Sequence, residues 1–485
     1  MDLDLSSEHQ LLRSTIRDFM ENEVAPVIDE HERQHRFPVE VVKRLGEMGW
    51  LGIPIPEDEG GAGMDTLAYA IAIEEIGRVW GSLGLIVAAH TSLGCGPLHL
   101  AGSKEQKDRY LVPMASGNVI GAYGLTEPGA GSDAGGTRTT ARDEDGEWVI
   151  DGGKRFITNA GQAGTYILTA RTGSREDGAA EISAFILPAD TPGFRVVRIE
   201  DKLGLHASAT GELAFDRCRI PGENLLGERG EGFRMFLKIL DGGRISIGAL
   251  AVGIAQGAYD ASVPYAQTRQ QFGKPIGSFQ GVAFMIADMA TEIEAARALV
   301  WKAAWLKDQS RDYSLTAAQA KLFASEVSSR VTNAAIQVHG GYGYVTEYPV
   351  ERYLRDAKLT EIGEGTSQVQ RLVIAQDPGA ADRLGSGWGP ASARLGTGQP
   401  GHGLGRGGRS RHTQAGRDRT PPRNDQVTLN CTRRTLSRYW LYLPTHVWSV
   451  IEGTGWSAMA QAASDGSTTR HETTLNQWTL PALSA

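Results

Sequence analysis

Glu364 stands between Gly363 and Gly365, and a glutamate in such a setting is one candidate for acid–base chemistry. Glycine neighbours leave the carboxylate and the adjacent backbone N–H groups free to face a ligand. A buried carboxylate has a raised pKa and can remove a proton from carbon if hydrogen-bond donors stabilise the oxyanion that forms. Taken alone, however, such a turn is more typical of a glutamate in contact with solvent.

A second segment with chemical potential is the glycine-rich stretch YGLTEPGAGSD at residues 123–133. Gly129 and Gly131 permit close approach of the backbone to a ligand, and Pro128 stiffens the turn. The hydroxyls of Thr126 and Ser132, together with backbone N–H groups, can bind carbonyl or phosphate oxygens. A well-capped surface turn has a similar composition, so this segment does not identify a ligand by itself.

Four motifs follow one another in the order and spacing of one enzyme family: residues 123–133, KRFITNA at 154–160, QVHGG at 337–341 and IGEGTSQ at 362–368. Through them the sequence resembles the acyl-CoA dehydrogenases, in particular the short- or medium-chain, butyryl-CoA dehydrogenase-like members. The resemblance covers about residues 5–376. It implies an FAD-dependent flavoprotein of fatty acid metabolism and β-oxidation that converts an acyl-CoA to a trans-2-enoyl-CoA.

The resemblance also implies a role for individual positions. Glu364 would be the catalytic base that removes the α proton while a hydride leaves the β carbon for flavin N5. Many members have Trp where this chain has Phe156, so the flavin contact is smaller here. The implied cofactor-binding residues are Tyr123, Leu125, Thr126, Gly131, Ser132, Phe156, Ile157, Thr158, Arg269, Phe272, Gln280, Gln337, Val338, Gly340, Gly341, Thr366 and Gln368. The implied substrate-binding residues are Ser132, Asp241, Arg244 and Gly365, and no metal is implied.

The partners implied by the resemblance are an acyl-CoA substrate and an electron-transferring flavoprotein that accepts the electrons. Arg269 and the turn at residues 337–341 would bind the ADP part of an FAD held mainly by a neighbouring subunit. Such a shared site requires a homo-oligomer, and a dimer of dimers is expected. The guanidinium of Arg269 suits this task because it can hold a pyrophosphate by paired, charge-assisted hydrogen bonds.

Other enzymes on the same scaffold are the main alternatives. Some family members carry the base on a different helix, but the corresponding position here is Gly243, which leaves Glu364 as the candidate. Flavin monooxygenase-like relatives lack a glutamate in this turn, so they are disfavoured. An acyl-CoA oxidase differs in how the reduced flavin is reoxidised, and the motifs do not separate it from a dehydrogenase.

The elements that must position these residues form three regions of an α+β chain. Residues 1–118 have helical periodicity from residue 7 onward, where Ser7 and Gln10 indicate a capping box. Residues 119–230 contain short alternating runs, with Asp145-Gly146 and Asp151-Gly152 as hairpin signals, and predict a β-barrel or sandwich. Residues 231–378 return to a helical period and predict a four-helix bundle, with an apolar core stripe over residues 282–306.

Residues 379–485 differ in composition from the rest of the chain. They hold 12 arginines, no lysine, 6 acidic residues and five of the ten tryptophans, whereas residues 1–378 hold 37 basic and 51 acidic residues. This tail is predicted to be disordered or a non-native extension. Its positive charge and aromatic residues offer the only support for a remote alternative, a flavin-containing nucleic-acid-binding protein, which the acidic body disfavours.

Composition outside the motifs predicts a cytoplasmic enzyme. The first residues are acidic and lack the features of a signal or transit peptide, and no uninterrupted apolar run reaches the ~18 residues of a membrane span. Cys95, Cys218 and Cys431 are widely separated, so neither a disulfide framework nor a zinc site is expected.

Overall fold

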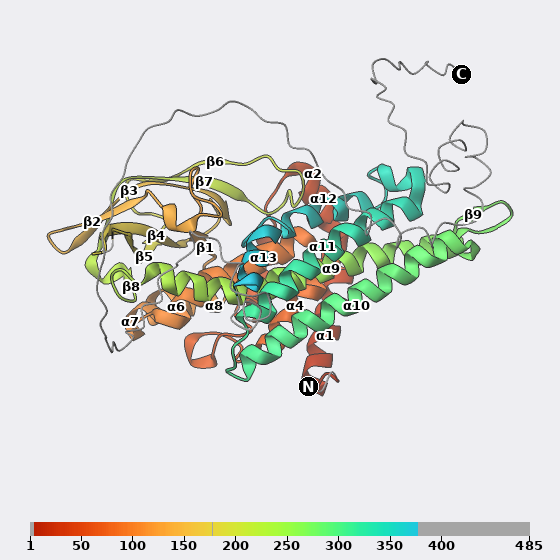
Figure 1. Cartoon of the computed structure of the whole chain (residues 1–485), viewed down its shortest axis with the longest axis horizontal. Helices are drawn as coiled ribbons and strands as arrows, with labels where there is room; N and C mark the ends of the chain where they lie inside the picture. The colour runs from red at the N-terminus through yellow and green to blue at the C-terminus, as the bar shows by residue number, and fades with distance from the viewer. Residues whose placement is uncertain (1–3, 177, 377–485) are drawn as a thin grey trace, which may run out of the picture. The chain divides into compact units, whose positions relative to one another are not determined.

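The structure is a computed structural model that describes residues 4–176 and 178–376. Helices, a sheet and further helices follow one another along the chain, which confirms the predicted α+β fold class (Figure 1). The expectations for residues 379–485, including Cys431 and the disordered tail, lie outside the described residues.

The N-terminal region consists of helices joined by short π-helical segments, among them η1 (Met20–Val24), η4 (Ala89–Cys95) and η5 (Lys107–Leu111). Its helices are α1 (Ser7–Phe19), α2 (Ile28–Gln34), α3 (Val39–Glu47), α4 (Thr66–Val79), α5 (Gly81–Ala88), α6 (Gly96–Ala101), α7 (Lys104–Gln106) and α8 (Val112–Ala115). The predicted capping box is wrong by one residue. Ser6 is the N-cap of α1 and accepts from the backbone N–H of His9, while the Gln10 amide donates to the carbonyl of Leu5.

The segment Gly81–Ala101 is long and apolar enough to cross a membrane by length and composition, but 72% of its apolar 18-residue window is buried inside the protein. It comprises α5, η4 and α6 and contributes Leu83, Ile86 and Leu98 to the hydrophobic cores. A core segment meets the same criteria of length and composition as a membrane span. Its burial therefore accounts for its apolar character.

One eight-stranded sheet forms the middle region, with the order β6-β7-β3-β2-β4-β5-β8 and with β1 paired in parallel to β4. The strands are β1 (Gly121–Gly124), β2 (Thr140–Glu144), β3 (Glu147–Thr158), β4 (Thr165–Ser174), β5 (Ala180–Pro188), β6 (Phe194–Ile199), β7 (Thr210–Pro221) and β8 (Leu225–Leu226). Strand β1 pairs with β4 and also contacts β3. The glycine-rich segment that follows β1 therefore lies beside β3.

Of the two predicted hairpin turns, the structure confirms one and shows that the other is wrong. Asp145 and Gly146 both have positive φ, at 59° and 85°, and join β2 to β3 as predicted. Asp151 and Gly152 instead lie inside β3, where the register with β7 shifts after Ile150. Gly152 has φ 137°, and an added Cβ would lie 2.8 Å from Thr139, so this glycine serves a bulge and a close strand approach.

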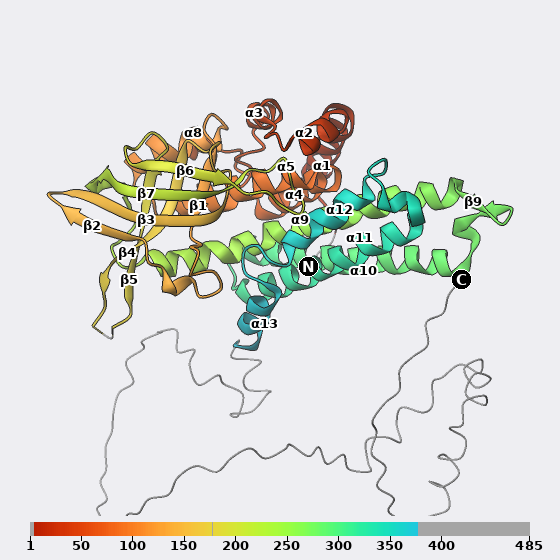
Figure 2. The same cartoon turned by 90° about the horizontal axis from the view of Figure 1, so that it is seen from above.

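Long helices form the C-terminal region and run side by side away from the sheet (Figure 2). They are α9 (Gly232–Thr268), α10 (Gln280–Asp308), α11 (Ser314–His339), α12 (Val350–Thr360) and α13 (Ser367–Ala375), with the small hairpin β9 (Gln270–Gln271) and β10 (Lys274–Pro275) between α9 and α10. The predicted apolar stripe of α10 is buried from Met289 to Leu306, whereas Val282, Met285 and Ile286 are only half-buried.

Glycines bring α4 and α9 into backbone contact. An added Cβ at Gly253 would lie 2.3 Å from the carbonyl oxygen of Glu74, and one at Gly257 would lie 2.1 Å from that of Arg78. Backbone atoms cannot yield as a side chain can, so any larger residue must push the two helices apart. This contact fixes α9, which carries Gly243 and Arg244.

Gly257→Ala should therefore lower the free energy of unfolding by about 1–3 kcal/mol, because overpacking separates α4 from α9. Gly281→Ala in α10 is the matched control, since an added Cβ there meets no atom within 4 Å. The control should leave stability unchanged or raise it by ~0.5–1 kcal/mol through helix propensity. Denaturant midpoints measure both changes, and equal midpoints for the two variants would contradict the packing argument.

Candidate active site

The turn between α12 and α13 holds Glu364 in a strained backbone conformation. Glu364 has φ 51° and Gly365 has φ 92°, so two successive residues are left-handed. This conformation is free for glycine but unfavourable for glutamate, and such residues concentrate at functional sites. Thr366 ends the turn as the N-cap of α13 and accepts a hydrogen bond from the N–H of Val369 at 3.2 Å.

The Glu364 side chain points into the protein. Its Oε2 atom is buried and has no hydrogen-bond partner among the described residues, although the residue as a whole is partly exposed. Burial raises the pKa of Glu364 to about 7, against the smaller opposing influences of Lys321 and Arg244. The carboxylate lies against α9, since a Cβ added to Gly243 would be 1.9 Å from Oε2. Gly243 therefore leaves the space that the Glu364 carboxylate occupies.

Two side chains that the sequence analysis did not predict hold the carbonyls of this turn. The Nζ atom of Lys321 donates to the carbonyl of Gly365 at 2.7 Å. The Nε2 atom of Gln370 donates to the carbonyls of Glu364 and Gly365 at 3.1 and 3.0 Å. Within the described residues, the backbone N–H groups of Glu364 and Gly365 make no hydrogen bond. They remain available to a ligand.

Polar side chains from other elements surround the turn. Tyr123 on β1 is buried, stacks on Phe236 with ring centroids 5.1 Å apart, and lies close enough to Glu364 for the carboxylate to raise its pKa further after burial. On α9, Asp241 and Arg244 form an ion pair. Burial raises the pKa of Asp241, whose Oδ1 also accepts from Ser314 at 3.0 Å. Residues from the sheet and from α9 thus meet at this turn.

A buried ion pair joins the glycine-rich segment to β3, and the sequence analysis did not predict it. Lys154 is fully buried, and its Nζ atom donates to Glu127 at 2.8 Å and to the carbonyl of Leu125 at 3.0 Å. Burial alone would raise the pKa of Glu127, but Lys154 and hydrogen bonds from Thr137 and Arg138 lower it to about 2. The pair fixes residues 125–127 against the strand that carries Phe156.

Residues beyond this ion pair face outward. Gly129 and Gly131 border open space, because an added Cβ would meet no atom within 4 Å, and Ser132 is exposed. Phe156 is 57% exposed with φ 61°, and the guanidinium of Arg155 lies over its ring at 4.9 Å. The remaining predicted contacts of this group are Thr126 and Thr158, which are half-buried, and Ile157, which is buried.

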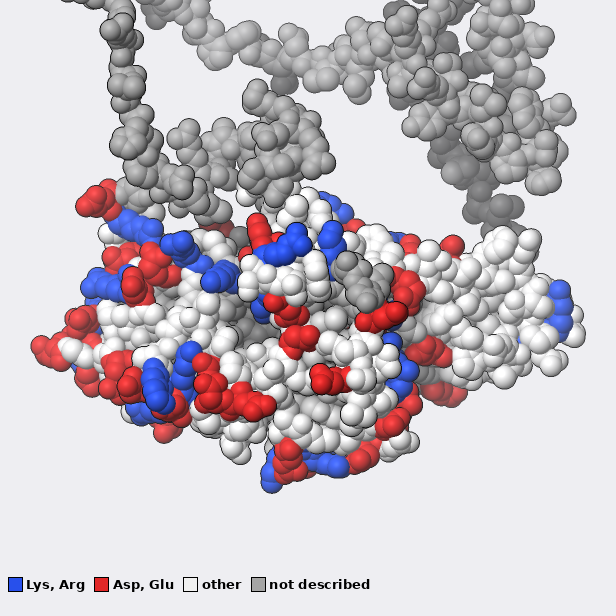
Figure 3. Space-filling view, turned by 90° about the horizontal axis from the view of Figure 1, so that it is seen from below, with Lys and Arg blue, Asp and Glu red and all other residues white. Residues whose placement is uncertain are grey.

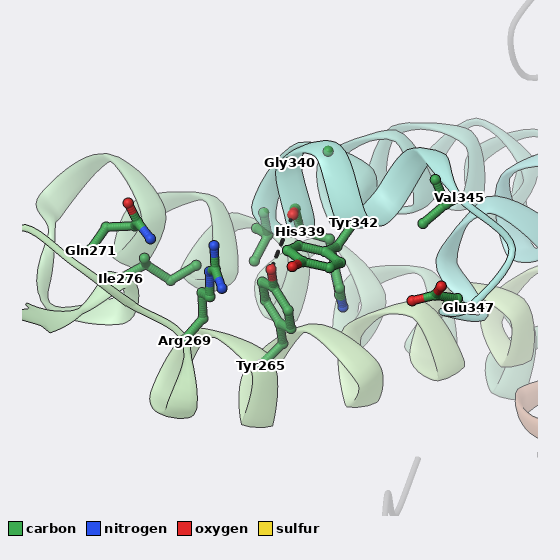
Figure 4. A pocket seen from close by; sticks show the side chains of 11 residues that line it. Tyr265, Arg269, Gln271, Ile276, His339, Gly340, Tyr342, Val345 and Glu347 are labelled. Carbon is green, nitrogen blue, oxygen red and sulfur yellow. Dashed lines mark hydrogen bonds between the residues drawn. The ribbon is translucent and has the colours of Figure 1, made fainter.

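The second group of predicted residues lines a cavity of about 530 Å³ at the other end of α9 (Figure 4). Arg269, Val338, Gly340 and Gly341 all line it, whereas Phe272, Gln280 and Gln337 do not. Arg269 follows Arg244 by 25 residues along a helix that rises 1.5 Å per residue, so the two groups lie about 37 Å apart. The predicted site residues of one chain therefore form two separate groups.

Aromatic side chains form the wall of this cavity. Tyr265 stacks on His339 at 4.2 Å and donates to the His339 carbonyl at 3.2 Å, and Arg269 lies over Tyr342 at 5.1 Å. The His339 Nε2 atom is buried without a partner among the described residues. Arg269 makes no ion pair within residues 4–176 and 178–376, so its guanidinium is available to an anion. This donor set fits the pyrophosphate part of a dinucleotide such as FAD.

The last predicted contact, Gln368, is exposed in the first turn of α13. No group of three or more His, Cys, Asp or Glu side chains in the described part of the chain could hold a metal ion. Fold and site together define a cofactor-dependent enzyme with a buried carboxylate and a cavity that Arg269 and Glu347 both line.

Comparison with known proteins gives the family. Three family models match: acyl-CoA dehydrogenase N-terminal domain over residues 6–118, middle domain over residues 122–218 and C-terminal domain over residues 230–377. The chain therefore belongs to the acyl-CoA dehydrogenase family, a family of oxidoreductases whose cofactor is FAD.

Individual relatives are similar over the same part of the chain. The short-chain specific acyl-CoA dehydrogenase of Clostridium acetobutylicum is 50% identical over 375 residues, which are 77% of this chain and 99% of the relative. Butyryl-CoA dehydrogenase from Megasphaera elsdenii matches with a TM-score of 0.76 and 43% identity over 77% of this chain and 99% of that chain. A structure described as the electron transferring flavoprotein of Acidaminococcus fermentans matches with a TM-score of 0.76 and 47% identity. The match covers 77% of this chain and 98% of that chain.

Gly243→Ala should slow flavin reduction by acyl-CoA by about 10²-fold, because its methyl group displaces the Glu364 carboxylate and small misplacements at a reacting group cost that much. Stability should change little, since the displaced atom is the end of a flexible side chain. Gly242→Ala is the control, because there an added Cβ meets only the Lys307 Nζ atom at 3.5 Å. Anaerobic stopped-flow absorbance of the flavin measures both rates, and equal rates would contradict the predicted displacement.

Proposed function

We propose that this chain oxidises a short- or medium-chain acyl-CoA to the trans-2-enoyl-CoA with FAD as cofactor and Glu364 as the catalytic base. The observation that carries the proposal is a buried carboxylate that burial brings to a pKa of about 7, next to backbone N–H groups that have no partner among the described residues. The short-chain specificity of the Clostridium relative favours the shorter substrates.

The proposed proton transfer uses groups of this chain. The ionised Glu364 carboxylate takes the α proton, which becomes more acidic when the thioester oxygen is held by hydrogen-bond donors. The backbone N–H of Glu364 makes no hydrogen bond within the described residues and is the proposed donor. Asp241 and Arg244 would line the substrate entrance, with Ser132 and Gly365 near the thioester arm. FAD, when bound, accepts the hydride that leaves the β carbon.

The proposed cofactor contacts come from two copies of the chain. The group from Tyr123 to Thr158 would bind the flavin ring, and Thr366 with Gln368 would contact the nucleotide. Arg269 lies about 37 Å from Arg244 along the direction of α9, and the 337–341 turn lines the same cavity as Arg269. Both would therefore serve the FAD of a neighbouring subunit. This arrangement needs a homo-oligomer, for which we propose a dimer of dimers.

Exposed apolar side chains support contact between copies. Phe272, Tyr344 and Phe284 are 93%, 86% and 59% exposed. Figure 3 shows that uncharged side chains dominate the end of the molecule near β9, whereas acidic and basic residues alternate around the sheet. Large exposed apolar surfaces are typical of interaction sites. Phe272, Gln280 and Gln337, which lie outside the cavity, would act at this interface.

The wider setting is part of the same proposal. An electron-transferring flavoprotein would accept the electrons, and this is supported because a structure described as such a flavoprotein contains a chain similar to this one. A role in β-oxidation and a cytoplasmic location are proposed from the similarity to bacterial dehydrogenases. The proposed domains are residues 1–118, 119–230 and 231–378.

Glu364→Gln tests the base directly, because glutamine keeps the shape of the side chain but cannot accept the proton. Flavin reduction by butyryl-CoA should fall by ~10²–10⁴-fold or more, while FAD content and acyl-CoA binding persist. Glu361→Gln is the control, since Glu361 lies in the same turn but bonds to Lys358 and Ser329. Stopped-flow absorbance reports reduction, and a Glu364→Gln rate equal to that of the control would place the base elsewhere.

A further inference from the structure

Lys321 is a buried cation that the proposed reaction does not yet use. It lies in α11 with no exposed surface, and it makes no ion pair with a carboxylate of the described residues. Removing an ammonium group from water is costly unless other groups compensate for the lost solvation. Burial lowers the pKa of the Lys321 ammonium to about 8, against the opposing influence of Glu364. The cost of burying the Lys321 ammonium indicates that this residue has a specific role.

The contact that Lys321 makes is with the turn that carries Glu364. Its Nζ atom donates to the carbonyl of Gly365 at 2.7 Å, across 44 residues of sequence. The Gln370 amide donates to the same carbonyl at 3.0 Å. Gly365 has φ 92° and follows the left-handed Glu364, so the two donors hold a peptide that would otherwise relax.

The charge of Lys321 also acts on the Glu364 carboxylate. The groups that face this carboxylate are Lys321 from α11, Arg244 from α9, Tyr69 from α4 and Tyr123 from β1. Burial raises the pKa of both tyrosines, so they stay neutral near pH 7. Arg244 is paired with Asp241, and Glu361 is paired with Lys358 at the start of the turn. Lys321 is thus the unpaired positive charge among these neighbours in the described part of the chain.

We propose that Lys321 is a positioning residue for proton abstraction: its ammonium holds the Gly365 carbonyl, and its charge favours the ionised form of the buried Glu364 carboxylate. This inference rests on the proposed function, in which Glu364 is the base. Lys321 does not touch the reacting atoms. It acts through the turn and through the field at the carboxylate.

The direction of the pH effect follows from the charges. The base works when Glu364 is ionised, so the parent rate of flavin reduction should fall as the pH drops through about 7. Loss of the Lys321 charge raises the pKa of Glu364 further, which moves this acid limb to higher pH. At higher pH, where Glu364 ionises without help and Lys321 itself loses its proton near pH 8, the rates of the parent and of a variant that keeps a hydrogen-bond donor should converge.

Three variants separate the charge from the hydrogen bond. Lys321→Gln keeps a donor but loses the charge, Lys321→Met loses both, and Lys321→Arg keeps both. Anaerobic flavin reduction by butyryl-CoA is measured from pH 5.5 to 9, with FAD content as the check on folding. The Gln and Met variants should be slower by about tenfold or more at pH 6, and the Arg variant should restore the position of the acid limb. The Met variant, which lacks the donor to the Gly365 carbonyl, should also stay slower than the Gln variant at high pH.

Lys358→Met is the matched control. Lys358 lies in α12 and pairs with Glu361 at 2.6 Å, but its side chain is 53% exposed, so solvent screens its charge. Its acid limb should coincide with that of the parent. Lys321 variants that are slower at every pH by one constant factor, with an unmoved acid limb, would reduce Lys321 to a structural role and overturn the proposal.

A readout without turnover separates this proposal from the proposed function. The infrared band of the protonated Glu364 carboxyl is identified by its absence from Glu364→Gln, and its titration is followed in parent and Lys321→Gln. A midpoint moved to higher pH supports the field of Lys321, even if Glu364→Gln still reduced its flavin and the base were elsewhere. Coincident midpoints would contradict the proposal while leaving Glu364 as the base.

Discussion

The structure depends on one requirement, that a carboxylate be kept away from water and still be able to ionise near neutral pH. Glu364 meets it at a junction of elements, with its Oε2 atom buried and unpaired within the described residues and with its pKa raised by burial to about 7. Water would lower the basicity and compete for the hydrogen bonds that an enolate needs. The cost is a glutamate in a left-handed conformation, which the surrounding contacts must hold in place.

Packing far from the turn sets the space for this carboxylate. Gly243 leaves room for Oε2 on one face of α9, and ten residues further along the same helix Gly253 lies against the backbone of α4. Helix α9 couples the positions of the two glycines, because interiors are close-packed and yield little. On the side of the sheet, the buried ion pair of Lys154 and Glu127 fixes the position of the glycine-rich segment against β3. The chemistry proposed for Glu364 therefore depends on helix and strand packing as much as on the turn.

Sequence periodicity and motif order were sufficient to predict the three regions and the α+β class, and they singled out Glu364. Local signals failed where tertiary contacts gave a residue another use: Gly152 serves a bulge within β3 rather than a hairpin, because its backbone lies against Thr139. The role of Lys321 could not be predicted from the sequence, because a lysine in a helix is usually solvated. Its contact with Gly365 joins residues that are 44 positions apart. The separation of Arg269 from Arg244 along α9 likewise appears only when the helix length is known.

The central claim is that Glu364 removes a proton from the α carbon, and isotope exchange tests this step without hydride transfer. Phenylacetyl-CoA has α protons but no β hydrogen to give to the flavin, so the enzyme can exchange these protons with D2O without being reduced. NMR of the α signal in D2O should show rapid exchange with the parent protein and none above background with Glu364→Gln. Equal exchange by both proteins would show that another group abstracts the proton and would contradict the account.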